Sequence, residues 1–221
     1  MSCTVTNNLY VNNPTPLGKG NGEIYAGIGT GVTPKVDSIT AINKAVNFSN
    51  RISTDAILSI GGQIGIGDRT SLRLAIHFPR LVGGFGFRAG VQRSLYDSAS
   101  HFNVAIATDV GFVVSKDSIK ILGSSSAIEA KEINGAFNAD VFIPMSFELR
   151  PNVRLVLTPR YSVNTFFMRR YQDNKSSRPF GIQYPAFSLG LRIKRFCVEA
   201  TALYYQTTIY PHVGTAFFVK N

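Results

Sequence analysis

The sequence has no tryptophan, only two cysteines and few charges. Asp, Glu, Lys and Arg make up 16% of the 221 residues, whereas they make up about a quarter of a typical soluble domain. No stretch approaches the roughly 20 consecutive apolar residues that a membrane-spanning helix needs. The sequence therefore excludes a helical membrane protein, but not a membrane β-barrel, whose strands need only about ten alternating residues each.

Residues that bind metals or catalyse reactions are also sparse. The cysteines Cys3 and Cys197 and the histidines His77, His101 and His212 follow none of the spacings that are typical of metal sites. We therefore expect no metal and no cofactor, and we predict that the protein is not an enzyme. An outer-membrane lipase or acyltransferase stays open as an alternative.

Positive charge is in excess, with 23 Lys and Arg against 13 Asp and Glu, a net charge of +10 and a pI of about 9.8. Such an excess can indicate binding to nucleic acid or to an anionic membrane. The cations form no stripe, however, because several stand singly in expected strands and others gather in one expected loop. We therefore expect no nucleic-acid partner.

Alternation of apolar and polar residues, the period of a β-strand, dominates the rest of the sequence. The segments "SLRLAIHF" from Ser71 and "VFIPMSFEL" from Val141 are examples. The pattern recurs almost to the end of the chain and predicts an all-β protein. We expect a closed antiparallel up-and-down barrel of about ten strands, with eight as the alternative. The barrel would take residues 23–221, after a flexible lead-in at residues 1–22.

The connections between the expected strands alternate in length. Long connections are expected at residues 34–54, 116–134 and 167–183, and short ones at "GDRT", "YDSAS", "LRPN" and "IKRF". Short periplasmic turns and long extracellular loops are typical of outer-membrane barrels. The pattern therefore predicts an integral outer-membrane protein whose N- and C-termini are both periplasmic.

The polar face of the strands consists mainly of small residues with scattered charges. In a lipid-embedded barrel this face lines the lumen, and a ten-stranded lumen is only slightly wider than one that side chains just fill. We therefore expect a lumen charge network that plugs rather than conducts. Its members would be Glu23, Arg73, Arg88, Asp109, Glu148, Arg154, Arg160, Arg192 and Glu199. In a soluble lipocalin-like binder, the alternative, the apolar face would line the interior.

Both ends of the sequence resemble those of small outer-membrane β-barrel lipoproteins of the Bacteroidota type. The start, "CTVTNNLYVNNPTPLGKGNGEIYAGIG", is similar to the start of those proteins, which implies that Cys3 is acylated. The end, "HVGTAFFV", resembles the bacterial barrel-assembly signal, although Lys220 and Asn221 follow where that signal normally finishes on an aromatic residue. The resemblance implies that the signal consists of His212, Gly214, Phe217 and Val219. It implies a fold and a location, but no single activity.

The leading functional hypothesis is a structural or accessory subunit of a larger outer-membrane protein complex, in export, barrel-assembly or uptake machinery. A small channel, or a carrier for apolar molecules, is the alternative in the same membrane. Besides outer-membrane lipid, lipopolysaccharide is an expected partner, because a basic cluster in the third long connection would meet its phosphates or an acidic protein. A purely solvated loop is the other explanation of this cluster, which consists of Arg169, Arg170, Lys175 and Arg178.

Overall fold

The computed structural model describes residues 6–7, 13–40, 45–79, 84–96, 101–121, 128–170 and 179–220. The regular structure of these residues is made of β-strands. They are β1 (Thr6–Asn7), β2 (Gly22–Thr40), β3 (Ala45–Gly65), β4 (Thr70–Pro79), β5 (Gly84–Ser94), β6 (Phe102–Ile121), β7 (Ile128–Phe142), β8 (Met145–Arg150), β9 (Val153–Arg170), β10 (Phe180–Ile193), β11 (Phe196–Tyr205) and β12 (Thr208–Lys220). Among these residues, none belongs to a helix that is long and apolar enough to cross a membrane.

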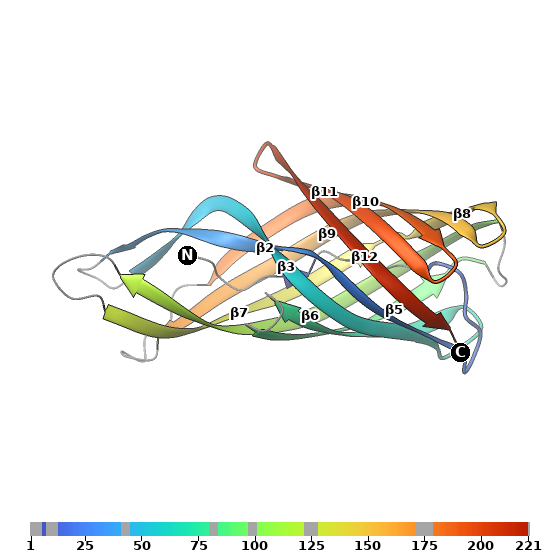
Figure 1. The fold of residues 1–221 in the computed structure, drawn as a ribbon, viewed down its shortest axis with the longest axis horizontal. Helices are drawn as coiled ribbons and strands as arrows, with labels where there is room; N and C mark the ends of the chain where they lie inside the picture. The colour runs from blue at the N-terminus through green and yellow to red at the C-terminus, as the bar shows by residue number, and fades with distance from the viewer. Residues whose placement is uncertain are drawn as a thin grey trace.

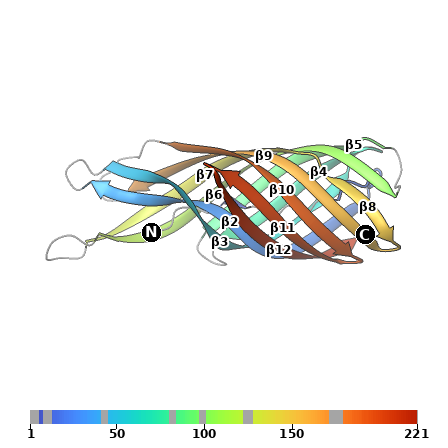
Figure 2. The same ribbon diagram turned by 90° about the horizontal axis from the view of Figure 1, so that it is seen from above.

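Antiparallel pairing joins the strands into a closed ring. Neighbours in the chain pair with one another, and β12 returns to pair with β2, from Lys220 opposite Glu23 to Gly214 opposite Gly29. The result is a ten-stranded barrel, which confirms the fold that the alternation predicts. Figures 1 and 2 show the strands running obliquely to the long axis of the barrel, and closure of a sheet requires such a tilt.

β7 and β8 are two halves of one barrel strand, because both lie between β6 and β9. They are separated by Ile143 and Pro144. Proline has no N–H to donate to a neighbouring strand, so the regular pairing stops there. The alternation nevertheless continues across the break, since Phe142 and Ser146 on either side are both buried.

The two ends of the barrel differ. At one end, which we call the turn end, residues 66–69, 151–152 and 194–195 form short connections. At the other, the hairpin end, strands run further than the alternation predicts. β2 with β3, β6 with β7, and β7 with β9 stay paired well into the expected long connections. Figure 1 shows these hairpins extending to the left, and the C-terminus at the turn end on the right.

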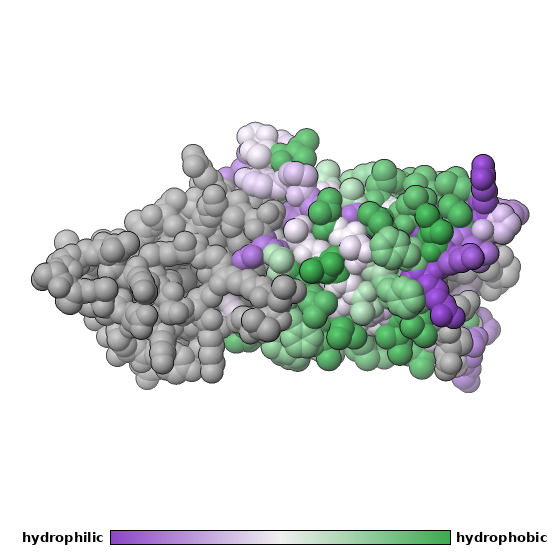
Figure 3. Space-filling model, in the orientation of Figure 1, coloured by the Kyte–Doolittle hydropathy of each residue, from purple (hydrophilic) through white to green (hydrophobic). Residues whose placement is uncertain are grey.

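The outer and inner faces of the wall have opposite character. Large apolar side chains point outward, and Ile24, Val110 and Val213 are 63%, 62% and 65% exposed. Charged side chains such as Glu23 and Asp109 point inward and are buried. Figure 3 shows the apolar residues in green around the middle of the described surface and hydrophilic residues in purple at the turn end. A lipocalin-like binder would need the apolar face inside, so the structure does not fit that alternative.

Part of the expected lead-in contacts the barrel directly. Pro14, Thr15 and Leu17 are buried near the turn end. β1 pairs with Gly31 and Val32 of β2, on the edge that β12 leaves beyond Gly29. Thr6 and Asn7 therefore lie in the half of the barrel nearer the hairpin end, and a periplasmic N-terminus stays a prediction, because residues 1–5 lie outside the described residues. The physical reason for the place of β1 is the free edge of β2, which offers backbone groups to any further strand.

The register at the closing seam can be tested by cross-linking. In a chain that carries Cys3→Ser and Cys197→Ala, the pair Phe217→Cys/Ala26→Cys should form a disulfide, because these residues are directly opposite each other. Opposed residues have Cα atoms about 4.5–5.5 Å apart, which suits a disulfide. Non-reducing electrophoresis would detect it. The staggered pair Phe217→Cys/Ile28→Cys should stay reduced, and equal cross-linking of both pairs would contradict this register.

Candidate functional site

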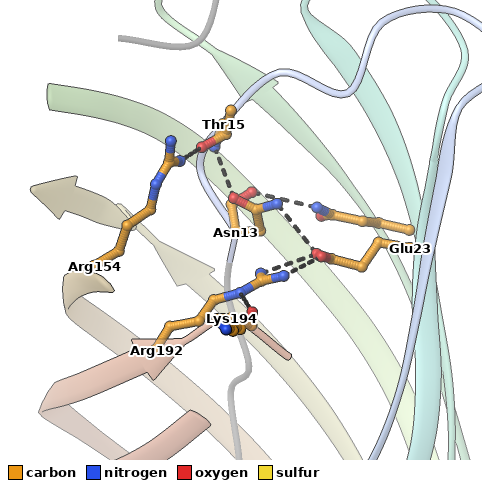
Figure 4. A network of polar contacts seen from close by, with 7 residues as sticks. Asn13, Thr15, Glu23, Arg154, Arg192 and Lys194 are labelled. Carbon is orange, nitrogen blue, oxygen red and sulfur yellow. Dashed lines mark hydrogen bonds and ion pairs between the residues drawn. The ribbon is translucent and has the colours of Figure 1, made fainter. Parts of the chain in front are cut away.

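The inner wall at the turn end holds a short N-terminal segment across the lumen. Asn13 is its best-connected residue (Figure 4). Its side-chain Nδ2 donates to Glu23 Oε2 at 3.1 Å, and its carbonyl oxygen accepts from Gln92 Nε2 at 2.6 Å and from Gln63 Nε2 at 3.4 Å. The wall residues come from β2, β3 and β5, so one residue of the segment ties three strands together.

Further contacts fix the residues that follow. Ser94 Oγ donates to the Pro14 carbonyl oxygen at 2.8 Å, and Arg154 Nη1 donates to the Thr15 hydroxyl oxygen. Thr15 N–H in turn donates to the Asn13 side-chain oxygen at 3.2 Å. We call residues 13–17 the N-terminal plug, because they lie buried against side chains from separate sides of the barrel.

The carboxylate of Glu23 joins the plug to the wall. Glu23 is 2% exposed, and besides Asn13 it binds the guanidinium of Arg192, whose Nη1 lies 3.2 Å from Glu23 Oε2. The Arg192 guanidinium also lies over the ring of Phe218, 4.0 Å from its centroid. Breaking a buried ion pair by removing one partner leaves an uncompensated charge, so Glu23 and Arg192 depend on each other.

Outside the plug, the turn end opens into a vestibule of about 300 Å³. Arg154, Arg192, Lys194 and Arg195 line it, together with Glu23, Glu148 and Phe218. The two acids are already bound to cations, since Arg154 Nη2 lies 3.4 Å from Glu148 Oε2 and Arg192 binds Glu23. The vestibule is therefore a positively charged entrance that ends at the plug.

Further into the lumen, ion pairs cross between strands in what we call the charged layer. Arg73 Nε lies 3.3 Å from Asp109 Oδ1, and Arg88 Nη2 lies 3.3 Å from Asp140 Oδ2. Arg73, Arg88, Asp109 and His77 line a cavity of only about 20 Å³, which is room for about one water molecule. The charged layer thus leaves little open space beside these side chains.

Towards the hairpin end the lumen also holds an apolar cluster. Phe166, Ile182, Tyr184 and Leu203 form one cluster of buried side chains, to which Val32 of β2 also belongs. Tyr184 and Leu203 are 1% and 0% exposed. Asn164 and Arg160, 1% and 4% exposed, are paired in the sheet with Ile182 and Ala186 of this cluster, so apolar and polar side chains are mixed in this half of the lumen.

The residues expected in the lumen charge network all occupy inward-facing positions. Among them, Glu23 pairs with Arg192, Arg73 with Asp109 and Glu148 with Arg154. Arg160 and Glu199 are also buried, at 4% and 5% exposure, and Glu199 Oε1 accepts a hydrogen bond from Thr201 Oγ1 at 3.3 Å. Uncharged side chains link these pairs, because Arg73 Nη1 donates to Gln92 Oε1 at 3.1 Å, and Gln92 binds Asn13, which binds Glu23.

The other sequence-derived residues lie as follows. In β12, His212 and Gly214 face inward while Phe217 and Val219 face outward, and His212 Nδ1 lies 2.9 Å from Thr30 Oγ1. Arg169 and Arg170, expected in a loop, instead form the end of β9, where the backbone of β7 continues to pair with them. Cys3, Lys175 and Arg178 lie outside the described residues. Among those that are described, no group of His, Cys, Asp or Glu side chains is arranged to hold a metal ion.

Sequence reasoning missed several partners in the lumen. Gln63, Gln92 and Asp140 stand at inward-facing positions of the alternation. The sequence therefore predicts that they lie in the lumen, but it does not predict which residues they bind. Asn13 and Thr15 follow no periodic pattern. Only the register between strands and the path of the N-terminal segment bring these residues together.

Comparison with known proteins gives similarities of fold alone. No family model matches the chain, and no curated protein matches it. Ail, the attachment invasion locus protein of Yersinia pestis, is 10% identical with a TM-score of 0.39, over 91% of this chain and 99% of Ail. The TodX monoaromatic hydrocarbon channel is 12% identical with a TM-score of 0.38, over 95% of this chain and 70% of TodX. At these TM-scores the likenesses carry neither a family nor an activity to this chain.

The pair Arg88 and Asp140 should be coupled energetically. Arg88→Met should lower the free energy of unfolding by about 3–5 kcal/mol, because Asp140 would stay buried without its cation. The double variant Arg88→Met/Asp140→Asn should lose less than the single one, since no buried charge is left unpaired. Denaturant unfolding followed by circular dichroism would measure both. Losses that simply add for the two positions would contradict the coupling.

Proposed function

We propose that this protein is a non-enzymatic integral outer-membrane β-barrel that serves as a structural or accessory subunit of a larger envelope complex. The observation that carries the proposal is the combination of an apolar outer wall with an inner wall whose charges bind one another and the N-terminal plug. Such a barrel fits a lipid environment on the outside and leaves little of its lumen for transport.

The membrane location is supported by closure together with the apolar outer wall. Backbone groups that face hydrocarbon must be paired within the protein, and a closed barrel achieves this without a free edge. Large side chains such as Phe137 and Val110, 61% and 62% exposed, would be costly in water but suit lipid tails. Short connections at one end are typical of the periplasmic side of outer-membrane barrels, so we infer that the turn end faces the periplasm.

Two features that follow each other along the lumen support the proposal that it does not conduct ions. The N-terminal plug closes the turn end through the contacts of Asn13 and Thr15. Behind it, the charged layer leaves a cavity of about 20 Å³. With the interior committed to its own contacts, a role through the outer wall and the exposed connections is favoured over transport. The basic cluster Arg169, Arg170, Lys175 and Arg178 would then meet lipopolysaccharide or an acidic partner outside the cell.

A carrier for apolar molecules is the second candidate, and the apolar cluster of the lumen favours it. Phe166, Ile182, Tyr184 and Leu203 line the half nearer the hairpin end, where a hydrophobic solute would be protected from water. In this candidate the plug would have to leave its place for the solute to pass.

Conductance in a planar bilayer should separate a plugged barrel from an open one. The full chain should show little conductance, and a variant that lacks residues 1–17 should stay nearly closed because the charged layer remains. A variant that lacks residues 1–17 and also carries Arg73→Ala/Asp109→Ala should conduct in steps, because the plug and one ion pair of the charged layer are both gone. The conservative control Thr15→Ser keeps a hydroxyl group for Arg154 and should stay closed. High conductance of the full chain would overturn the plugged barrel and favour a channel.

The accessory role predicts recovery in detergent together with a larger partner. After fractionation of native membranes and extraction in mild detergent, mass spectrometry should find one outer-membrane protein in constant ratio to this chain. Recovery in detergent without such a partner would contradict the accessory role and favour the carrier. Release into aqueous buffer would contradict the membrane location itself.

A further inference from the structure

The outer wall of the barrel carries an apolar groove close to the turn end. Its volume is about 510 Å³, within the range of about 300–1,000 Å³ that ligand sites usually have. Ile24, Ile64, Leu72, Leu74 and Val219 line it, on the outward faces of β2, β3, β4 and β12. These residues belong to the apolar wall, so the groove faces the same surroundings as the rest of that wall.

A glycine makes the groove. Gly62 lies opposite Ile24 in the register of β2 and β3, and it stands at an outward position that bulky residues fill elsewhere in these strands. A Cβ atom at Gly62 would lie 2.5 Å from the Glu23 carbonyl oxygen, which is too close for any side chain. The same approach of the two backbones that requires glycine thus leaves a gap between the side chains of Ile24, Ile64 and Leu74.

The apolar wall ends at the turn end in a rim of cations, which we call the basic collar. Among the described residues its members are exposed, and three of them stand directly beside outward apolar residues. Lys194 and Arg195 stand between Ile193 and Phe196, which are both 47% exposed, and Arg150 follows Leu149 at 57%. The collar members whose side chains are described are Lys19, Arg69, Arg93, Arg150, Lys194 and Arg195, and the exposed acid among the described residues of this end is Asp68. Cations at the edge of an apolar wall lie where phosphate groups of lipids lie in a bilayer.

Lys19 and Arg69 belong to the connections that border the groove. Lys19 belongs to the turn before β2, and the neighbouring Gly20 N–H donates to the Gly65 carbonyl oxygen at 2.8 Å, directly after Ile64. Arg69 closes the connection between β3 and β4, whose Ile64 and Leu72 line the groove. The apolar groove and two cations of the basic collar therefore lie next to each other on the outer wall.

We propose that this place binds an anionic phospholipid, with one acyl chain in the groove and the phosphate held by Lys19 and Arg69. The proposal rests on the membrane location proposed above, and it adds a specific partner at the turn end. Charge complementarity selects the anionic headgroup, and the apolar lining selects the acyl chain. A zwitterionic lipid offers the same chain but no net charge to the collar.

A single introduced tryptophan can report this binding, because the natural sequence has none. Ile66 is the next outward residue after Ile64 and does not line the groove, so Ile66→Trp places the fluorophore at its rim without filling it. The full chain is reconstituted in vesicles that contain brominated phosphatidylglycerol or brominated phosphatidylcholine, and fluorescence quenching is measured. Val141→Trp, outward on β7 and away from the groove, is the matched control.

The expected result is a preference for phosphatidylglycerol of about fivefold to tenfold at Ile66→Trp, and none at Val141→Trp. Adding Lys19→Gln/Arg69→Gln should abolish the preference, whereas the matched pair Lys194→Gln/Arg195→Gln should leave most of it. Equal quenching by both lipids at Ile66→Trp would overturn the lipid site while the membrane location stands. A preference that disappears equally with either pair would overturn the assignment to Lys19 and Arg69. Absence of quenching at both positions would overturn the membrane location as well.

Discussion

The pairing of β12 with β2 is the interaction on which the rest of the structure depends. It joins the last strand to the first long one from Glu23 to Gly29 and so turns a sheet into a ring. Once the ring is closed, each barrel strand has neighbours on both sides, and alternate residues must point either outward or into the lumen. The apolar wall and the charged interior are thus two consequences of one closure.

A narrow closed lumen places strict demands on the charges inside it. A buried charge is tolerated only when a partner compensates it, and the partners here come from other strands rather than from the next residue. Arg88 on β5 binds Asp140 on β7, and Arg73 on β4 binds Asp109 on β6. These pairs skip one strand of the ring, so they stabilise the curvature of the wall as well as neutralising each other.

The sequence predicted most of the fold and less of the site, for a physical reason. Alternation depends on neighbouring residues alone, so it identified the strands and the inward positions of Arg73, Asp109 and Glu199 without any tertiary information. Partners depend on register, and the match of Arg88 with Asp140 follows only after β6 is placed between their strands. The outer ends of β7 and β9 show the opposite effect, since pairing between them extends the strands through Arg169 and Arg170, which local pattern alone leaves in a loop.

The position of the N-terminal plug cannot be predicted from the pattern of its own residues, because contacts with the barrel determine it. Residues 13–17 are held mainly by side chains of the inner wall, such as Gln92, Ser94 and Arg154, while the strands that form the ring pair with one another. The plug therefore follows the shape of a lumen that already exists, and no repeat in its own sequence is needed to place it. For the same reason, withdrawing it removes interior hydrogen bonds but no pairing between the strands that close the ring. Closure of the wall and closure of the lumen therefore rest on different contacts, the first on pairing between strands and the second on side chains of the inner wall.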